Sequence, residues 1–390
     1  MKISKALITF CIILLPIIGV TAPRAFGFIP AVLGLVAFSE YIFTQKKLPK
    51  IDWALSGFFL VFFMLAGLSY FWSVDPDFTI KRVVKLIILV IPSILLLSTA
   101  RSTKLVSMRF LRILPYSLIA ASVLILIETY CNYPLYRLLR ELSAEDTVEL
   151  SVTNWGLIII SLLTWPVLYK LWLERNKAII IIMLITIALA IFSATSQSAM
   201  VAFALGLFSL IISIKQPKLL LYAVGGGTIV GILSSPWIAQ GLFDLRPEIF
   251  VKWVHASAAQ RMELWDFIAR KALESPWYGW GIEATRNIDD FDSSKIFFVK
   301  TNILHPHNFA LQLWIELGLL GAISGMAFIV LCVKRFLKID TRQLPFVISC
   351  FIAALVVNLV GYGMWQGWLI GLQFIAAFLF ITFLKQDEKE

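Results

Sequence analysis

Long apolar runs separated by short polar stretches make up most of the chain. About twelve of these runs approach the roughly 20 residues that a helix needs to cross a bilayer. They lie near residues 6–22, 26–44, 52–71, 82–100, 111–130, 153–173, 178–194, 197–214, 218–236, 307–333, 344–362 and 366–384. This pattern predicts an all-α polytopic membrane protein with about 12 transmembrane helices.

The composition favours the same class. Hydrophobic residues fill 59% and charged residues 15% of the 390 positions, and a soluble domain has no interior that hides so much apolar surface. Membrane topology explains the net charge of +10 better than nucleic-acid binding does. With the N-terminus inside, the internal connections are the basic ones, near 45–51, 101–112, 170–177, 214–218 and 334–343. The positive-inside rule therefore predicts that both termini are cytoplasmic.

Two external connections are longer than a link between helices requires. One covers roughly 131–152, and the other, roughly 237–305, is long enough for a small helical subdomain. We therefore expect spans one to nine in 1–236, a loop subdomain in 237–305, and three further spans with a cytoplasmic tail in 306–390. The first run follows Lys2 and Lys5 as in a signal peptide, but a second run begins at once, so we expect an uncleaved first span.

The long external connection contains one strong helix signal. Ser257-Ala258-Ala259-Gln260 is typical of a capping box and predicts a helix that runs to about Glu274. On that helix Arg261, Trp265, Ile268 and Ala272 share one face. A guanidinium on this inward face requires an anionic partner, which is either a substrate or a loop carboxylate.

The segment from His305 to Gly318 ends the long connection and begins the next apolar run. Pro306 suits the first turn of a helix, which predicts His307 at the helix N-terminus. The helix dipole there disfavours imidazolium and favours anions, so a neutral His307 is suited to act as a general base. The alternatives are that His307 only caps the helix, or that His305 is the functional histidine.

A polar stripe continues down the same helix through Asn308, Gln312 and Glu316. Glu316 lies about 15 Å below the helix start, where a carboxylate costs roughly 2.5–3.5 kcal/mol and needs a partner. It lies on the opposite face from His307. We interpret it as a structural hydrogen-bond anchor.

Basic residues also gather at the external mouth of an earlier span. Trp72-Ser73-Val74-Asp75-Pro76 leads to Lys81, Arg82 and Lys85. These side chains either bind phosphate or anchor the helix at the interface, and anchoring is favoured for Lys85. Arg82 runs against the positive-inside bias and stays a candidate for phosphate binding.

Together these features resemble the O-antigen ligase and O-antigen polymerase superfamily of bacterial envelope glycosyltransferases. The matching pieces follow the family's order: Trp72-Ser73 with Asp75-Pro76 and Arg82, Asn154, Arg261 with Trp265, Pro276-x-x-Gly279-x-Gly281, and His307-Asn308 with Leu311, Glu316 and Gly318. The twelve-span layout with one large periplasmic loop also resembles the family, which implies a GT-C-like fold over essentially the whole chain.

The resemblance implies an inner-membrane enzyme whose active site faces the periplasm. The donor would be a glycan on undecaprenyl diphosphate, and the acceptor a sugar hydroxyl of lipid A–core. Transfer would invert the anomeric centre without a metal or other cofactor. The implied roles are catalysis by His307 and Arg261, binding of the donor diphosphate by Arg82, Arg261 and Lys81, and support by Asn308, Glu316 and Gln197. Whether His307 is a base or a diphosphate ligand stays open.

One position departs from the family. Gln197 stands where the family often carries an arginine, so another cation would have to serve. The candidates are Arg137, Arg140, Arg246 and Arg286. Asp289, Asp290 and Asp292 cluster in the long connection, and a solvated acidic turn is favoured there over a divalent-cation site.

Other functions remain in competition with O-antigen ligation. Within the same superfamily, the polymerase branch extends a lipid-linked glycan and a third branch glycosylates protein hydroxyls. A lipid-linked glycan transporter is the alternative from a different class. It predicts charged residues deep within several spans, whereas the basic residues here gather at the external mouth.

Overall fold

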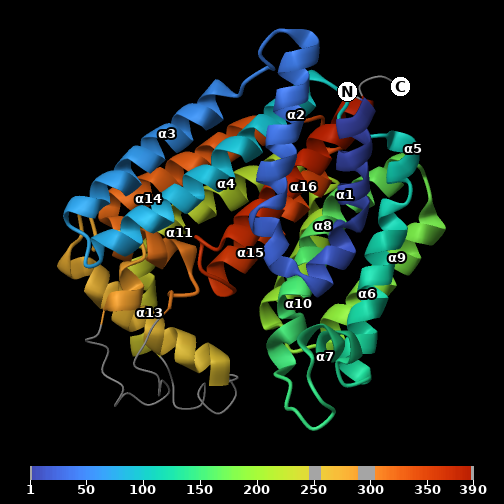
Figure 1. Ribbon diagram of the computed structural model, residues 1–390. Coiled ribbons are helices and arrows are strands. Elements are labelled where there is room, and N and C mark those ends of the chain that lie inside the picture. Colours follow the sequence, from blue (N-terminus) through green and yellow to red (C-terminus); the bar gives the residue numbers. More distant parts are fainter. Residues whose placement is uncertain (1, 246–255, 289–303, 388–390) are drawn as a thin grey trace.

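The computed structural model of the chain describes residues 2–245, 256–288 and 304–387. Regular structure in these ranges is entirely helical (Figure 1). Twelve apolar helices correspond to the twelve predicted runs: α1 (Lys2–Thr21), α2 (Ile29–Gln45), α3 (Trp53–Leu68), α4 (Pro76–Ser102), α6 (Leu114–Tyr130), α8 (Asn154–Leu173), α9 (Lys177–Ser193), α10 (Gln197–Ser213), α11 (Pro217–Asp244), α14 (Phe309–Phe336), α15 (Leu344–Val360) and α16 (Gly367–Asp387).

Shorter elements connect these helices. They are η1 (Pro23–Gly27), η2 (Ser69–Phe71), α5 (Met108–Leu111), α7 (Pro134–Arg140), η3 (Leu150–Thr153), α13 (Ala256–Glu274) and η4 (Ala284–Asn287). The helix predicted from the capping box is α13. Because it already includes Ala256, Ser257 is a helical residue and not the cap; the residues before Ala256 lie outside the described ranges.

The prediction of a polytopic membrane protein is confirmed. Among the residues described, eight helical segments are long and apolar enough to cross a membrane, and α2, α9, α10 and α15 are shorter apolar helices of 17 residues each. The chain therefore has several membrane-spanning helices, while the total of twelve spans stays a prediction.

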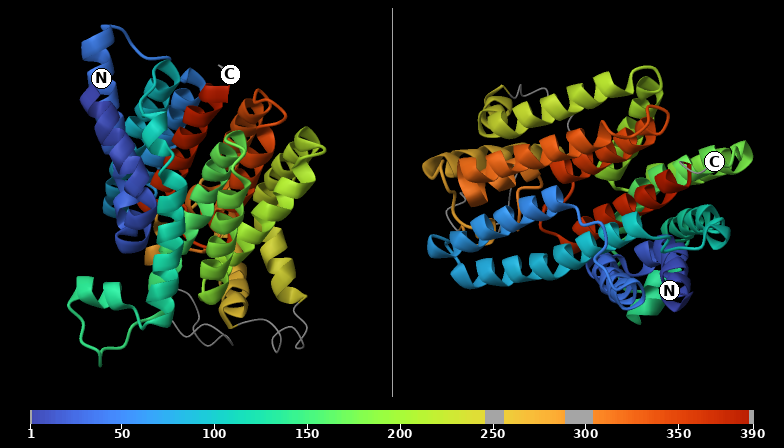
Figure 2. Two further views of the ribbon diagram at one scale, coloured as in Figure 1. Left: turned by 90° about the vertical axis from the view of Figure 1, so that its right-hand side faces the viewer. Right: turned by 90° about the horizontal axis from the view of Figure 1, so that it is seen from above.

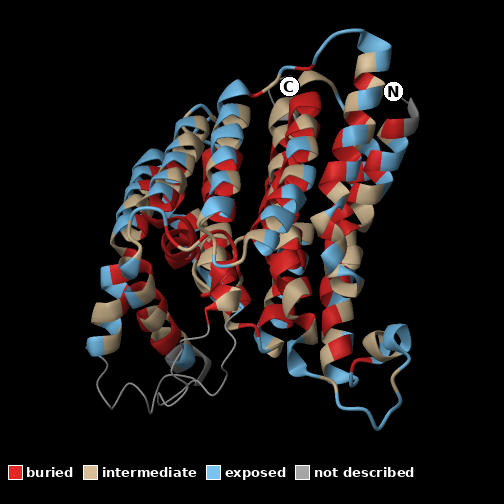
Figure 3. Ribbon diagram, turned by 60° about the vertical axis from the view of Figure 1, so that its left-hand side comes forward, coloured by how far each residue is buried: buried red, intermediate tan, exposed pale blue. Residues whose placement is uncertain are grey.

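The helices lie side by side in a bundle with a buried centre. The two termini lie at one end, and α7 and α13 lie at the opposite end (Figures 1 and 2). Helix α8 is the most enclosed, since 89% of its span is buried against 22% for the span that contains α3. Exposed positions lie along the outer helices (Figure 3), and many carry large apolar side chains such as Phe43 and Leu60. Such a surface suits contact with lipid.

Helix α14 is broken at Gly318, whose φ of 60° and ψ of −147° lie outside the helical region. The connection 275–281 after α13 fills the break. Four backbone hydrogen bonds of 2.7–3.3 Å join them, two from the N–H groups of Trp280 and Gly281 to the carbonyls of Ile315 and Glu316, and two from Leu319 and Leu320 to those of Pro276 and Trp277. The break leaves N–H and C=O groups of α14 without partners in the helix. It is stable because the backbone of the connection 275–281 forms hydrogen bonds with these groups.

The segment between α3 and α4 holds this connection from the other side. The Trp72 indole donates to the Tyr278 carbonyl at 3.0 Å, and the Val74 N–H donates to the Trp280 carbonyl at 3.1 Å. Asp75 caps α4 through the Phe78 N–H and also accepts from the Asn287 amide at 2.6 Å. The motif around Trp72 is thus part of the scaffold that fixes the connection after α13.

Candidate functional site

The backbone around His307 differs from the sequence prediction. Helix α14 begins at Phe309, and the side chain of Asn308 caps it by accepting from the N–H groups of Ala310 and Leu311 at 3.0 and 3.2 Å. The expectation that Pro306 lies in the first turn, with His307 at the helix N-terminus, is therefore wrong. The asparagine cap moves the start two residues on and leaves His307 before the helix, in a left-handed conformation with φ 53°.

The hydrogen bond of His307 defines its tautomer. Its Nδ1 lies 2.7 Å from the Gly361 carbonyl oxygen, which can only accept, so Nδ1 carries the proton. In the neutral ring Nε2 is then an unprotonated acceptor. Burial lowers the pKa of His307 below its ordinary value, the Gly361 bond raises it and the nearby charge of Arg261 lowers it. The net shift is downward, which favours the neutral imidazole.

Helix α13 brings Arg261 to this histidine. Trp265, one turn further along α13, donates from its indole to the Pro306 carbonyl at 2.8 Å and so ties the helix to the His307 segment. Ile268 and Ala272, on the same face, are fully buried. Burial lowers the pKa of the Arg261 guanidinium, and Tyr362 lies close enough to raise it slightly.

Arg261 has no acidic partner in the described part of the chain. No carboxylate there forms an ion pair with it. The predicted acidic turn of Asp289, Asp290 and Asp292 lies outside the described residues, as does Arg246. Among described side chains no three His, Cys, Asp or Glu groups are arranged to hold a metal.

His305 is held by a different set of contacts. The Trp368 indole donates to Oε1 of Gln366 at 2.6 Å, which leaves the Gln366 amide nitrogen to donate to Nε2 of His305 at 3.4 Å. The ring lies 4.2 Å from that of His307. Burial, and then His307 and Arg286, lower the pKa of His305 to about 3. Because its Nε2 is already occupied, His305 is a weaker candidate for a base than His307.

Arg82 lies in an ion-pair cluster. Its Nε is 2.6 Å from Glu283 Oε1, and its Nη1 donates to the Trp365 carbonyl at 3.0 Å. Arg286 pairs with the other oxygen of the same carboxylate. Glu283 is 5% exposed and has φ 65°. The charge of Arg82 is thus already partly neutralised, whereas Lys81, the adjacent residue on α4, is exposed to solvent.

The connection 361–366 between α15 and α16 joins these groups. Its Gly361 carbonyl holds His307, its Met364 N–H donates to Gln312 Oε1 at 3.0 Å, and its Trp365 indole donates to Glu316. The Gln312 amide also donates to Glu316, at 2.9 Å. This connection was not predicted from the sequence. Its signal is the run Gly361-Tyr362-Gly363-Met364-Trp365-Gln366-Gly367, rich in glycine and aromatic residues between two spans.

The start of α10 lies against the same connection. Gln197 is the first residue of α10, and a side chain on Gly361 would contact the Cβ of Ser198 at 3.4 Å. Just before α10, the Thr195 hydroxyl lies 3.4 Å from the side-chain oxygen of Asn154. Gln197 and Asn154 are therefore near the connection that holds His307, and among the described residues neither forms a hydrogen bond with His307.

Arg24 is a cation that the sequence analysis missed. It is exposed on η1 and stands 5.5 Å from the centre of the Trp155 ring. Trp155 in turn lies 6.2 Å from Tyr362. Of the cations expected to replace an arginine at Gln197, Arg286 is paired and Arg137 donates to the backbone of Asn132, Ser143 and Asp146. Arg140 is exposed and stands 5.9 Å from the centre of the Tyr136 ring.

Comparison with known proteins finds a partial family match and several similar sequences. A family model described as O-antigen ligase matches residues 180–326, which include Arg261, the connection 275–281 and the His307 segment. Curated relatives named "putative polysaccharide ligase" include proteins from three Rickettsia species. They are 24% identical over 65% of this chain in R. conorii, 27% over 55% in R. typhi and 29% over 57% in R. felis.

The matches cover only part of each curated relative. The aligned regions make up 62%, 54% and 53% of those three proteins, so the chain spans somewhat more than half of their length. No solved structure matches the chain. The family model and the relatives nevertheless agree with the resemblance that the residues carry, because residues 180–326 match an O-antigen ligase model and the chain is similar to curated polysaccharide ligases.

Proposed function

We propose that this chain is an inner-membrane glycosyltransferase that moves a glycan from undecaprenyl diphosphate to a sugar hydroxyl of lipid A–core. The observation that carries the proposal is the pairing of a neutral His307, unprotonated at Nε2, with the half-buried Arg261 beside it. A base and a cation in one place are what an attacking hydroxyl and a departing diphosphate require.

The reaction follows from these two groups. The acceptor oxygen attacks the anomeric carbon while His307 Nε2 takes the hydroxyl proton. The bond from that carbon to the phosphate oxygen breaks, and its electron pair leaves with the diphosphate. Attack from the face opposite the leaving group inverts the anomeric centre. The proton then passes from His307 to solvent or to the diphosphate, which restores the base.

Arg261 is the principal candidate to stabilise the leaving diphosphate. The absence of a described carboxylate partner supports this role, since a guanidinium then keeps its charge for a ligand. Arg82 would act through the Glu283 cluster and contribute less charge, Lys81 would meet phosphate only at the exposed rim, and Arg24 would supply the cation that Gln197 does not. Asn308, Glu316 and Gln197 would position these groups.

The proposed orientation places the end of the bundle with α13 and the His307 segment in the periplasm and both termini in the cytoplasm. The basic residues of the internal connections support this orientation because they meet near the C-terminus. Arg101 and Arg335 both pair with Asp52, and Lys385 donates to the Arg101 carbonyl at 2.9 Å. The His307 segment and α13 lie at the other end.

The test is an in vitro transfer assay with purified protein, undecaprenyl-diphosphate-linked glycan and lipid A–core in the presence of EDTA. Glycan on lipid A–core supports the ligase function and metal-independent transfer. Longer lipid-linked chains without core modification would move the function to the polymerase branch. Intact protein that forms neither product would contradict both the ligase and the polymerase function. An assay with a protein acceptor and an assay of lipid-linked glycan flipping would then separate the remaining alternatives.

A further inference from the structure

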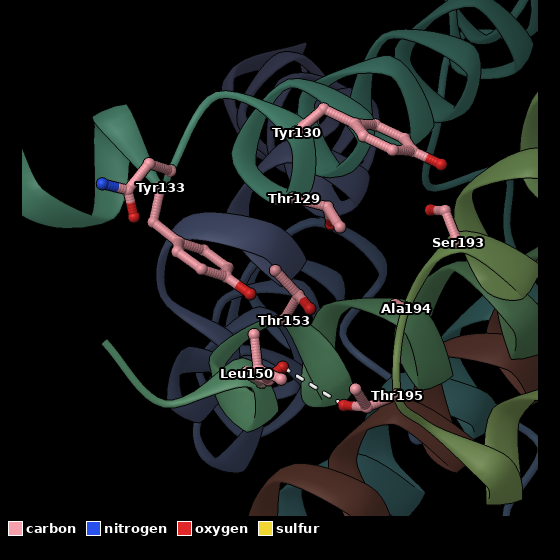
Figure 4. A pocket seen from close by; sticks show the side chains of 9 residues that line it. Thr129, Tyr130, Tyr133, Leu150, Thr153, Ser193, Ala194 and Thr195 are labelled. Carbon is pink, nitrogen blue, oxygen red and sulfur yellow. Dashed lines mark hydrogen bonds between the residues drawn. The ribbon is translucent and has the colours of Figure 1, made fainter. Parts of the chain in front are cut away.

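A pocket of about 390 Å³ opens at the end of the bundle that carries α7, between the end of α6, η3 and the α9–α10 connection (Figure 4). Its volume lies within the range of roughly 300–1,000 Å³ that is usual for small-molecule sites. It does not include His307 or Arg261, so it is separate from the candidate active site.

The lining of this pocket is polar but uncharged. Six of the nine lining residues carry hydroxyl groups, namely Thr129, Tyr130, Tyr133, Thr153, Ser193 and Thr195. Asn132 adds an amide, and no lining residue is ionic. Such hydroxyls both donate and accept hydrogen bonds, as sugar hydroxyls do. The two tyrosine rings also offer apolar faces to a sugar ring. An uncharged sugar therefore fits this lining better than a phosphate or a carboxylate.

Two buried hydroxyls in the pocket are available to a ligand. Tyr133 and Thr153 are only 5% and 6% exposed, and within the described ranges neither side-chain hydroxyl has a hydrogen-bond partner. Figure 4 shows the hydroxyl end of Tyr133 directed towards Thr153. By contrast, Thr129, Ser193 and Thr195 donate to backbone carbonyls, which leaves their lone pairs to accept.

The fold holds Tyr133 in place at a conformational cost. Tyr133 has φ 58°, which is unfavourable for a bulky side chain. Its N–H donates to the Glu128 carbonyl at 2.7 Å. The buried Glu128 carboxylate accepts from the N–H groups of Leu135 and Tyr136 at 2.8 and 2.9 Å and so starts α7. The tyrosine is thus fixed from both sides before any ligand arrives.

The pocket lies near the candidate active site. Thr195 precedes Ser198 by three residues, a stretch that spans at most about 10 Å, and Ser198 lies against Gly361, which holds His307. Trp155, two residues after Thr153, lies 6.2 Å from Tyr362. The start of α10 and the Trp155 side chain therefore link the pocket to the connection that holds His307.

We propose that this pocket is a subsite for an uncharged sugar residue of the glycan substrate. The inference rests on the proposed glycosyl transfer and adds to it a second point of contact, away from the reacting carbon. The sugar belongs either to the donor glycan, beyond its reacting unit, or to the acceptor core. Both present the same hydroxyl chemistry, and binding measurements distinguish them.

The experiment measures binding without turnover. Two probes are titrated into purified full-length protein by isothermal calorimetry: the oligosaccharide released by mild acid from the source organism's lipid-linked glycan, and core oligosaccharide released from its lipid A–core. Ala194→Trp fills the pocket, and Tyr133→Phe removes one of the two available buried hydroxyls and nothing else. Ala144→Trp on the exposed α7–η3 connection and Tyr136→Phe on α7 are matched controls.

One probe should bind wild-type protein. Its Kd should rise more than about tenfold in Ala194→Trp and about three- to tenfold in Tyr133→Phe, the effect of one lost hydrogen bond, with no change in the controls. Binding of the oligosaccharide from the lipid-linked glycan assigns the subsite to the donor. Binding of the core oligosaccharide assigns it to the acceptor. No binding of either probe, or equal binding by wild type and both pocket variants, would overturn the subsite. Binding at the pocket without any transfer would contradict only the proposed function.

Discussion

Gly318 and Gly279 meet backbone to backbone at the break in α14. A side chain on Gly318 would lie 2.8 Å from the Gly279 nitrogen and 2.5 Å from the Trp277 carbonyl carbon, while one on Gly279 would lie 2.5 Å from the Glu316 carbonyl carbon. Contacts this short with backbone cannot be relieved by a side-chain rotation. Both residues also have positive φ, of 60° and 66°. The connection after α13 therefore depends on two glycines to close against α14.

Replacing Gly318 with alanine should destabilise the protein strongly. The new Cβ would clash with backbone, and the conformation at Gly318 is one that alanine rarely adopts, at a cost of about 1–3 kcal/mol before the clash is counted. We expect a lower apparent unfolding temperature and a lower yield of purified protein. Gly227→Ala in α11 is the matched control, because a Cβ there meets nothing within 4 Å. Equal unfolding temperatures and yields of the two variants would disprove the close backbone contact at Gly318.

Removing the carboxylate of Glu316 should lower the amount of folded protein. Glu316 accepts from Gln312 and Trp365 at a fully buried position, and Glu316→Ala leaves both donors unsatisfied, at about 1–3 kcal/mol each. Glu316→Gln keeps an acceptor and should lie between alanine and wild type. Thermal unfolding in detergent measures the order. An inactive Glu316→Ala protein that accumulates normally would show that Glu316 has a direct role in the reaction.

Most of the helices could be predicted from the apolar pattern, but the break within α14 and the residue at which α14 begins could not. All twelve predicted runs are helices, because a lipid environment leaves a long apolar segment few alternatives. The break at Gly318 was not predicted, since an apolar helix with one glycine reads as continuous and only the backbone after α13 reveals the gap. The start of α14 was misplaced because Pro306 gave a plausible start signal, while Asn308 supplies the cap.

Arg261 and Arg82 should respond differently to substitution. Arg261→Ala removes a guanidinium without a described acidic partner, so the protein should fold while transfer falls by at least about 100-fold, the scale seen when one preorganised group for developing charge is removed. Arg82→Ala leaves the buried Glu283 with one partner fewer and should reduce stability by several kcal/mol, up to about 3–5. Transfer rates and unfolding temperatures of both variants provide the test. Unchanged transfer by Arg261→Ala would refute its role.

The glutamate at 283 offers a control for Arg82. If the loss in Arg82→Ala comes from the unpaired carboxylate, adding Glu283→Gln should restore part of the stability. A double variant no more stable than Arg82→Ala would show instead that the contact of Arg82 with the Trp365 carbonyl is the important one.

Acid should destabilise the folded protein through His305. Burial holds the pKa of His305 at about 3 in the fold, whereas an unfolded chain has the ordinary value of about 6.5. Between these values only the unfolded chain binds the proton, so stability falls as pH drops from about 6.5 towards 3, by up to about 1.4 kcal/mol per pH unit. His305→Asn should flatten this dependence in thermal unfolding between pH 4 and pH 6, values chosen inside the window. An unchanged slope would place the proton-linked group elsewhere.

The site could be predicted only where residues are neighbours on one element. The inward face of α13 followed from helical spacing, so Arg261 was found, and the His307-Asn308 pair was found as a local motif. The partner of Arg82 was not predicted, because Glu283 lies 201 positions further on in the sequence. Gly361 was missed for a different reason: it holds His307 through a backbone carbonyl, which any residue type possesses.

The most direct test of the central claim, that neutral His307 takes the acceptor proton, is the pH dependence of transfer at saturating donor and acceptor. The rate should fall on acidification with a midpoint below about 6.5, because the pKa of His307 is shifted downward. This fall is the acidic limb of the pH profile. His307→Gln should lower the rate by about 100-fold or more and remove the acidic limb, while His305→Asn should keep both the rate and the limb. A His307→Gln enzyme that retains the limb, or transfers at nearly the wild-type rate, would contradict the account.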